Sequence, residues 1–127
     1  MYDDPIKKMA NKLAKKTLEN LDKAFECADK YIIHGQKMLD FRVGITGNED
    51  LNERAKGKPY NGEYNLFEIF RDENANLIRE LEKNLISRYR KKVYYADHIK
   101  NDLNSPGGEG DIESHGAPYV TYIAVKK

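Results

Sequence analysis

The first part of the chain carries a hydrophobic pattern with the period of an α-helix. Asp4 and Pro5 form a helix start, because an N-cap residue precedes proline at the first helical position. The pattern predicts an N-terminal amphipathic helix over residues 1–29. The apolar face of this helix either covers the domain's own sheet or packs in part on a second copy of the chain, which would give a homo-oligomer. The apolar positions of the helix are Ile6, Ala10, Leu13, Ala14, Leu18, Leu21, Phe25 and Ala28.

Residues 30–45 have two interpretations. In the first, the helix continues to His34 and ends at Gly35, a natural C-terminal glycine. In the second, residues 31–33 and 39–45 form the two strands of a hairpin around a turn. Tyrosine and isoleucine suit a strand, which favours the hairpin.

Residues 41–45 alternate with the period of a half-buried strand and run into a short helix. Gly44 lies inside this strand, where a glycine often marks a place at which another backbone or a ligand comes close. A turn at 46–48 breaks the strand, and residues 49–56 have the composition of a short helix. The short helix therefore carries Arg54 back past the end of the strand.

The second half of the chain adds a strand, a helix and a last strand. Residues 64–70 have apolar side chains on both faces, which predicts a central strand covered on each side. Asp72 is a plausible N-cap for the next helix, whose apolar stripe spans residues 77–89 and places Glu82 at the border between core and solvent. Residues 119–125 form a clear final strand. Together these elements predict an α+β fold, with a small central mixed or antiparallel sheet of about three to four strands flanked by helices and an extra long N-terminal helix.

Composition narrows the class of protein. Charged residues make up 34% of the 127 residues and the net charge is +1, so any basic surface for nucleic acid must be local. Cys27 is the only cysteine, which leaves no internal disulfide and favours a reducing, cytoplasmic setting. No apolar run approaches the ~20 residues that cross a bilayer, so no membrane association is expected. The length fits one compact unit, made of the helix over 1–29 and an α/β domain over 30–127.

Three pieces of the chain follow one another in a recognisable order. The strand contains Arg42-Val43-Gly44, the short helix after it carries Arg54, and a later helix contains Glu82-Lys83-Asn84-Leu85-Ile86. In this order they resemble the GIY-YIG nuclease superfamily. The ending, Asn104-Ser105-Pro106-Gly107-Gly108 ahead of an aromatic strand, resembles the small stand-alone members of that superfamily. That family has two short strand motifs, then a helix with an arginine, and later a helix with a glutamate just ahead of a Leu-Ile pair.

The resemblance extends to two further positions and has clear departures. Ten residues lie between Tyr31 and Arg42, which puts Tyr31 at the place of the first motif's tyrosine. Asn104, with Asn101 as a rival, stands for the family's late asparagine. Asp29-Lys30 occupies the glycine and isoleucine positions of the first motif, and Arg42 occupies the tyrosine position of the second.

The resemblance implies a metal-dependent nuclease or phosphodiesterase that acts on DNA. Glu82 would hold a Mg²⁺ or Mn²⁺ ion, because a carboxylate is a hard oxygen ligand. Arg54 would neutralise the scissile phosphate with its planar fork of donors, and Tyr31 would help to activate water. The candidate binding residues are Arg42, Gly44, Thr46, Asn104 and Arg88.

Each catalytic candidate also has an ordinary structural interpretation. Glu82 can pair with Arg79 or Arg88 on a solvated helix flank. Arg54 can be an ion-pair partner at the surface, and Tyr31 can be a packing aromatic. If Tyr31 lies outside the cleft, the candidates to replace it are Tyr60, Tyr64, Tyr94 and Tyr95.

The altered tyrosine motifs and the balanced charge motivate a second hypothesis. The chain would then be a GIY-YIG-like protein that has lost catalysis and captures a nucleotide, a nucleic acid or a protein partner, as a phage-type anti-defence or regulatory protein. An enzyme that grips a polyanion usually carries a basic excess, and this chain does not.

Overall fold

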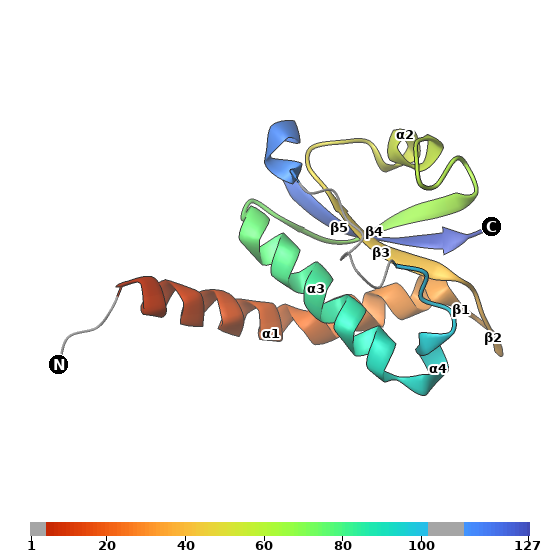
Figure 1. Cartoon of the computed structure of the whole chain (residues 1–127), viewed down its shortest axis with the longest axis horizontal. Helices are drawn as coiled ribbons and strands as arrows, with labels where there is room; N and C mark the ends of the chain where they lie inside the picture. Colours follow the sequence, from red (N-terminus) through yellow and green to blue (C-terminus); the bar gives the residue numbers. More distant parts are fainter. Residues whose placement is uncertain (1–4, 102–110) are drawn as a thin grey trace.

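The computed structural model of the chain describes residues 5–101 and 111–127, and Figure 1 shows their arrangement. The fold is α+β, as the sequence predicts. Among the described helices, none is long and apolar enough to cross a membrane. In chain order the elements are α1 (Pro5–Ile32), β1 (Ile33–His34), β2 (Lys37–Met38), β3 (Phe41–Thr46), α2 (Leu51–Lys56), β4 (Tyr64–Asp72), α3 (Ala75–Lys91), α4 (Val93–Ala96), the 3-10 helix η1 (Ile112–His115) and β5 (Tyr119–Lys126).

Three strands form the main sheet in the order β3–β5–β4, with antiparallel neighbours throughout. The last strand of the chain is therefore the central one. The prediction that residues 64–70 form a central strand is wrong, because β4 lies at an edge. Its apolar side chains are nevertheless covered on both faces. Tyr31 of α1 stacks on Phe67 with ring centroids 4.2 Å apart, and Tyr60 packs against Tyr64 at 5.6 Å.

The sheet separates two layers of helices (Figure 1). Helices α1 and α3 cover one face, and the short helix α2 with the loop after it covers the other. Side chains alternate along β5 accordingly. Ile123 and Val125 pack into the core beneath α1 and α3. Val120, Tyr122 and Ala124 pack into the core beneath α2 and its loop.

Helix α1 continues past the predicted boundary at residue 29 and ends at Ile32. The predicted strand over 31–33 is therefore wrong for Tyr31 and Ile32, which are helical. Ile32 is fully buried in the same core as Ala28, one turn earlier on the helix. Continuing the helix buries this side chain, and that gain outweighs the preference of tyrosine and isoleucine for strands.

A hairpin follows α1, but it is shorter than the predicted one. Strand β1 pairs with β2, and the pair Ile33 and Met38 marks its start. Gly35 lies in the turn with a φ of +63°, a backbone conformation that glycine adopts without strain. Strand β3, which we expected to return along the first strand, pairs with β5 instead.

The outer edge of β3 is covered by the segment that follows α4. The backbone N–H of Phe41 donates to the carbonyl of His98 at 2.9 Å, and that of Lys100 donates to the carbonyl of Phe41 at 2.8 Å. The buried side-chain amide of Asn101 then accepts from the N–H of Val43 at 2.9 Å and donates to its carbonyl at 2.8 Å. Asn101 thus continues the ladder and shields an edge strand from other chains.

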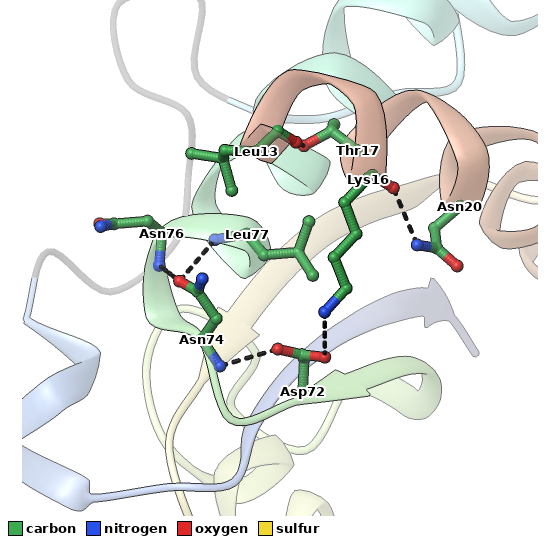
Figure 2. Close-up of polar contacts among 8 residues, drawn as sticks. All are labelled: Leu13, Lys16, Thr17, Asn20, Asp72, Asn74, Asn76 and Leu77. Atoms are coloured by element: carbon green, nitrogen blue, oxygen red, sulfur yellow. Dashed lines mark hydrogen bonds and ion pairs between the residues drawn. The ribbon is translucent and has the colours of Figure 1, made fainter. Parts of the chain in front are cut away.

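The turn between β4 and α3 ties the sheet to both large helices (Figure 2). Asn74 is the N-cap of α3, since its side-chain oxygen accepts from the N–H groups of Asn76 at 2.9 Å and Leu77 at 3.2 Å. The prediction of Asp72 as N-cap is wrong. Asp72 accepts from the N–H of Asn74 at 2.8 Å and forms an ion pair with Lys16 of α1 at 3.5 Å.

Candidate functional site

Strand β3 leaves room at Gly44 for the ring of Tyr122 on β5, its partner in the pairing register. A Cβ atom at Gly44 would lie 2.3 Å from Cζ and 2.4 Å from the hydroxyl oxygen of Tyr122. Only a glycine therefore lets this ring cross the strand. The prediction that Gly44 marks a close approach is confirmed, although the approaching group is a side chain rather than a backbone or a ligand.

The hydroxyl group of Tyr122 forms a hydrogen bond with the hydroxyl group of Tyr60, which lies in the loop after α2. The two phenol oxygens are 2.8 Å apart, and both side chains are buried. The loop is held by backbone hydrogen bonds, from the N–H of Tyr60 to the carbonyl of Gly57 at 3.0 Å and from that of Gly62 to the carbonyl of Ala55 at 2.8 Å. The loop thereby fixes one phenol over the other.

Two arginines flank this tyrosine pair. Arg54 of α2 donates through Nη1 to the carbonyl of Lys58 at 3.0 Å, and its Cζ lies 5.6 Å from the centroid of the Tyr60 ring. Arg42 lies on β3 two positions before Gly44, and its Cζ lies 5.9 Å from the centroid of the Tyr64 ring. Both guanidinium groups are half-buried. The arginine–tyrosine cluster is therefore Arg42, Arg54, Tyr60 and Tyr122.

Burial dominates the titration of the two phenols. It raises the pKa of Tyr60, while the hydrogen bond with Tyr122 and the charges of Arg54 and Arg42 act in the opposite direction. Burial also raises the pKa of Tyr122, and Arg54 opposes this through its charge and a side-chain hydrogen bond. Both phenols therefore stay protonated near neutral pH, and they act as hydrogen-bonding groups rather than as bases.

Glu82 lies on α3, in the layer on the other face of the sheet from α2 (Figure 1). Its side chain is only 2% exposed, and Ile78 and Ile86, one turn away on the same helix, are buried with it. Its Oε2 atom has no hydrogen-bond partner in the described part of the chain. Burial raises the pKa of Glu82 to about 8, and the charge of Arg79 lowers it in part. The expected position at the border between core and solvent is wrong, because the carboxyl group is inside.

The predicted catalytic pair is thus divided between two layers. Arg54 lies with the tyrosine pair beneath α2, and Glu82 lies in the apolar layer beneath α3. The negative charge of Glu82 does act on Tyr60, but it is the last of five influences on that pKa, after burial, the Tyr122 hydrogen bond and two arginines. The sheet brings Arg42, Gly44 and Arg54 together, and it does not bring Glu82 to the same surface.

A Mg²⁺ or Mn²⁺ ion does not fit the surroundings of Glu82. Mg²⁺ keeps several of its waters when it binds through one carboxylate, and the side chain of this residue is almost completely buried. Across residues 5–101 and 111–127, no three histidine, cysteine, aspartate or glutamate side chains gather as a set of metal ligands.

Two other predicted residues lie away from the arginine–tyrosine cluster. Tyr31 is in the last turn of α1, where it packs on Phe67 of β4. Arg88 lies near the end of α3, where it donates to the carboxylate of Asp22 at 2.6 Å and covers the ring of Phe25 at 5.2 Å. Both therefore join α1 to its neighbours.

The remaining predicted binding residues are Thr46 and the asparagine candidates. The hydroxyl of Thr46 donates to the carboxylate of Glu49 at 2.7 Å and so closes the turn between β3 and α2. Asn104 lies outside the described residues. Asn101, its rival, is engaged with the backbone of β3, as described above.

Tyr122 is the functional candidate that the sequence analysis missed. It was recognised only as part of a strand, because the register that places it over Gly44 joins residues far apart in the chain. Tyr60 was among the replacements named for Tyr31. A glycine in one strand and a large aromatic in another are the signal that such a crossing leaves in a sequence.

Comparisons with known proteins find no relative of the chain. No protein-family model, no curated protein and no solved structure matches the chain.

Proposed function

We propose that the chain is a GIY-YIG-like domain that binds the phosphate group of a nucleotide or a nucleic acid without cleaving it. The observation that carries this proposal is the arginine–tyrosine cluster, in which two half-buried guanidinium groups flank two buried, hydrogen-bonded phenols. The family resemblance supports a phosphate ester as the ligand, and the charges of Arg42 and Arg54 both act on Tyr60.

The two arginines suit a phosphate for physical reasons. A guanidinium group presents a planar fork of donors that matches two phosphate oxygens. Arg54 is already held by the carbonyl of Lys58 and by the ring of Tyr60, so little side-chain freedom is lost when a ligand binds. The Nε atom of Arg42 is buried and has no hydrogen-bond partner among the described residues. A bound anion would satisfy this donor.

The same geometry argues against cleavage. A phenol that acts as a base must lose its proton easily, and burial moves the pKa of Tyr60 and Tyr122 the other way. Glu82 lies in the opposite layer, and its carboxyl group is too deeply buried to meet a metal ion that keeps its waters. The arrangement therefore supports capture of a phosphate better than attack on one.

Metal-dependent cleavage of DNA is the rival function. One observation favours it: a buried carboxylate oxygen without a partner, on Glu82, is a costly feature that proteins often keep for a chemical purpose. In this rival, Mg²⁺ or Mn²⁺ would bind Glu82 after a rearrangement of the layer around it.

Thermal melting tests the proposal directly. The wild-type protein is melted against a panel of nucleoside monophosphates, diphosphates and triphosphates and short single-stranded oligonucleotides, with and without Mg²⁺. We expect at least one of these ligands to raise the melting temperature. Arg42→Gln should lower the affinity for that ligand by about tenfold, because one charge-assisted hydrogen-bonding group is lost. Arg71→Gln is the matched control, since it removes an exposed arginine that pairs with Glu68.

Incubation of supercoiled plasmid with Mg²⁺ or Mn²⁺ separates the two functions. We expect no nicking by the wild-type protein. Nicking that disappears in Glu82→Gln would establish the rival. If no ligand shifts the melting temperature, or if Arg42→Gln and Arg71→Gln weaken binding equally, phosphate capture at this cluster is rejected.

A further inference from the structure

The N-terminal end of α1 forms an arm that runs past the body of the domain (Figure 1). We define the N-terminal arm as residues 5–15, the part of the helix ahead of its first contact with the turn after β4. Its lysines are all exposed: Lys7, Lys8, Lys12 and Lys15. No hydrogen bond or ion pair joins any of the four to another described residue.

The base of the arm is fixed, as Figure 2 shows. Lys16 forms an ion pair with Asp72 at 3.5 Å, so the helix is tied to the turn that starts α3. The hydroxyl of Thr17 donates to the carbonyl of Leu13 at 2.9 Å, and the amide of Asn20 donates to the carbonyl of Lys16 at 2.8 Å. Thr17 is buried, so the helix enters the domain core at this point. The arm is therefore an extension of an anchored helix.

Charge is divided unequally between the arm and the rest of the chain. The arm carries four lysines and no acidic residue, so it has a charge of +4 in a chain whose net charge is +1. The rest of the chain therefore carries −3. Lys8, Lys12 and Lys16 lie four residues apart, where like charges on a helix repel each other. An unpartnered helix with this pattern is stabilised by an anionic partner.

We infer that the N-terminal arm docks onto the phosphate backbone of a DNA duplex. This inference goes beyond the proposed function, because it concerns a surface on the opposite side of the sheet from the arginine–tyrosine cluster. An 11-residue helix is about 16 Å long, and the major groove of B-DNA, about 12 Å wide, admits an α-helix. Lysines on such a helix reach phosphates on both sides of the groove.

Other occupants fit the arm less well. A second copy of the chain would bring lysines against lysines. A single strand of nucleic acid needs aromatic rings on which its bases stack, and no aromatic residue lies in the arm. A membrane surface needs an apolar face beside the lysines, and anionic vesicles test that occupant separately. Duplex RNA has a deep, narrow major groove that does not admit a helix.

Fluorescence anisotropy with a labelled DNA duplex tests the inference on the full-length protein over a range of salt concentrations. The arm variant replaces Lys7, Lys8, Lys12 and Lys15 with glutamine, which preserves helix propensity. The control variant replaces four exposed lysines elsewhere with glutamine, so that both variants have the same net charge. These are Lys30, Lys37, Lys83 and Lys127.

We expect the arm variant to bind the duplex at least about tenfold more weakly than the control variant. Its slope of log affinity against log salt should fall by about 3 to 4, since four phosphate contacts are lost. Far-UV circular dichroism confirms that both variants fold. Arg71→Gln, at an exposed arginine outside the arm and the cluster, should leave duplex binding unchanged. The arm variant should keep the melting-temperature shift that a mononucleotide causes in the wild type, so failure at the arm and failure at the arginine–tyrosine cluster are told apart.

Several results would overturn the inference. These are no duplex binding by the wild type, equal losses in the arm and control variants, or duplex RNA or single strands bound as tightly as duplex DNA. Light scattering that finds a dimer lost in the arm variant would assign the arm to a second copy instead. Arm-dependent binding to anionic vesicles without binding to DNA would assign it to a membrane surface.

Discussion

Tyr122 and Glu82 are buried polar residues on opposite faces of one sheet, and their surroundings differ. The hydroxyl of Tyr122 faces α2 and meets the hydroxyl of Tyr60 at 2.8 Å. The carboxyl group of Glu82 faces the core beneath α3, and its Oε2 has no partner among the described residues. The two tyrosines therefore bury their hydroxyl groups as a pair on one face, and the other face buries a carboxyl group whose charged form is strongly disfavoured.

The difference matters because burial has a different cost in the two cases. A buried hydroxyl pair replaces its hydrogen bonds to water with one between the two residues, which is close to neutral. A buried carboxyl group without such partners is stable only while it is protonated. The tyrosine pair is therefore stable as it stands, whereas Glu82 makes the stability of the α3 face depend on pH.

The largest expected effect is the pH dependence that Glu82 brings. Its pKa is about 8 in the folded chain and 4.5 in the unfolded reference, so between these values the folded state holds the extra proton. Stability from this group is complete below pH 4.5 and is lost as the pH rises through 8. By pH 9, Glu82→Gln should exceed the wild type in unfolding free energy by on the order of 4 kcal/mol, since each pH unit contributes up to about 1.4 kcal/mol.

Urea unfolding from pH 5 to pH 9 measures this difference. Glu80→Gln is the matched control, because Glu80 lies on the same helix and is half-exposed. Glu80→Gln should keep the pH dependence of the wild type. A parallel dependence in wild type and Glu82→Gln would mean that the carboxyl group is solvated, and the contrast between the two faces would disappear.

The next effect concerns the crossing of Gly44 and Tyr122. Gly44→Ala places a Cβ atom 2.3 Å from the Tyr122 ring, which must move or force the strands apart. We expect a loss of about 3 kcal/mol in unfolding free energy, as for other overpacked cores. Gly57→Ala is the control, since a Cβ there would lie 3.8 Å from the carbonyl of Arg54, at an ordinary contact distance.

A double mutant shows whether the ring is the cause of that loss. In a Tyr122→Ala background, Gly44→Ala should cost much less than in the wild type, because the ring that it strikes is gone. Equal costs in both backgrounds would mean that Gly44 is needed for another reason.

A smaller effect is expected from the hydroxyl pair itself. Tyr122→Phe leaves the Tyr60 hydroxyl buried and without its partner, which should cost about 1–2 kcal/mol. Replacing both tyrosines with phenylalanine should cost less than the sum of the two single changes, since neither hydroxyl is then left alone. Additive costs in urea unfolding would show that the two hydroxyls do not interact.

Periodicity in the sequence is enough to predict the three longer elements α1, α2 and α3 and the main strands, but it does not predict α4 or η1. The long N-terminal helix, the strand over 41–45 with its helix and the last strand are all present. The order of the strands was not predictable in the same way. Apolar residues on both faces of 64–70 indicated a central strand, whereas Tyr31 and Tyr60 cover an edge strand from both sides. Apolar residues on both faces indicate that other layers cover both faces of a strand, and they do not indicate whether both of its edges are paired.

The candidate site was predicted in part. Gly44, Arg42 and Arg54 were found because a strand and the helix after it are local features. The partners of these residues are distant in the chain, and only the pairing of β3 with β5 places Tyr122 over Gly44. Glu82 was placed at a solvent border from its helical spacing, but the position of a residue on a helix does not reveal how far the next layer extends over it.

The smallest expected effect is that of a change at Tyr89. This residue lies on α3, as Glu82 does, and it packs against α1. Its hydroxyl is buried without a hydrogen-bond partner among the described residues, and burial raises the pKa of its phenol. Tyr89→Phe removes an unsatisfied polar atom and keeps the ring contacts with Phe25 and Phe41, whose centroids lie 4.8 Å away in each case. We expect a gain of about 0.5–1 kcal/mol in urea unfolding, where the same change at Tyr122 causes a loss. If both changes destabilise the protein equally, the hydroxyl of Tyr89 has a partner, and the two faces of the sheet treat buried phenols alike.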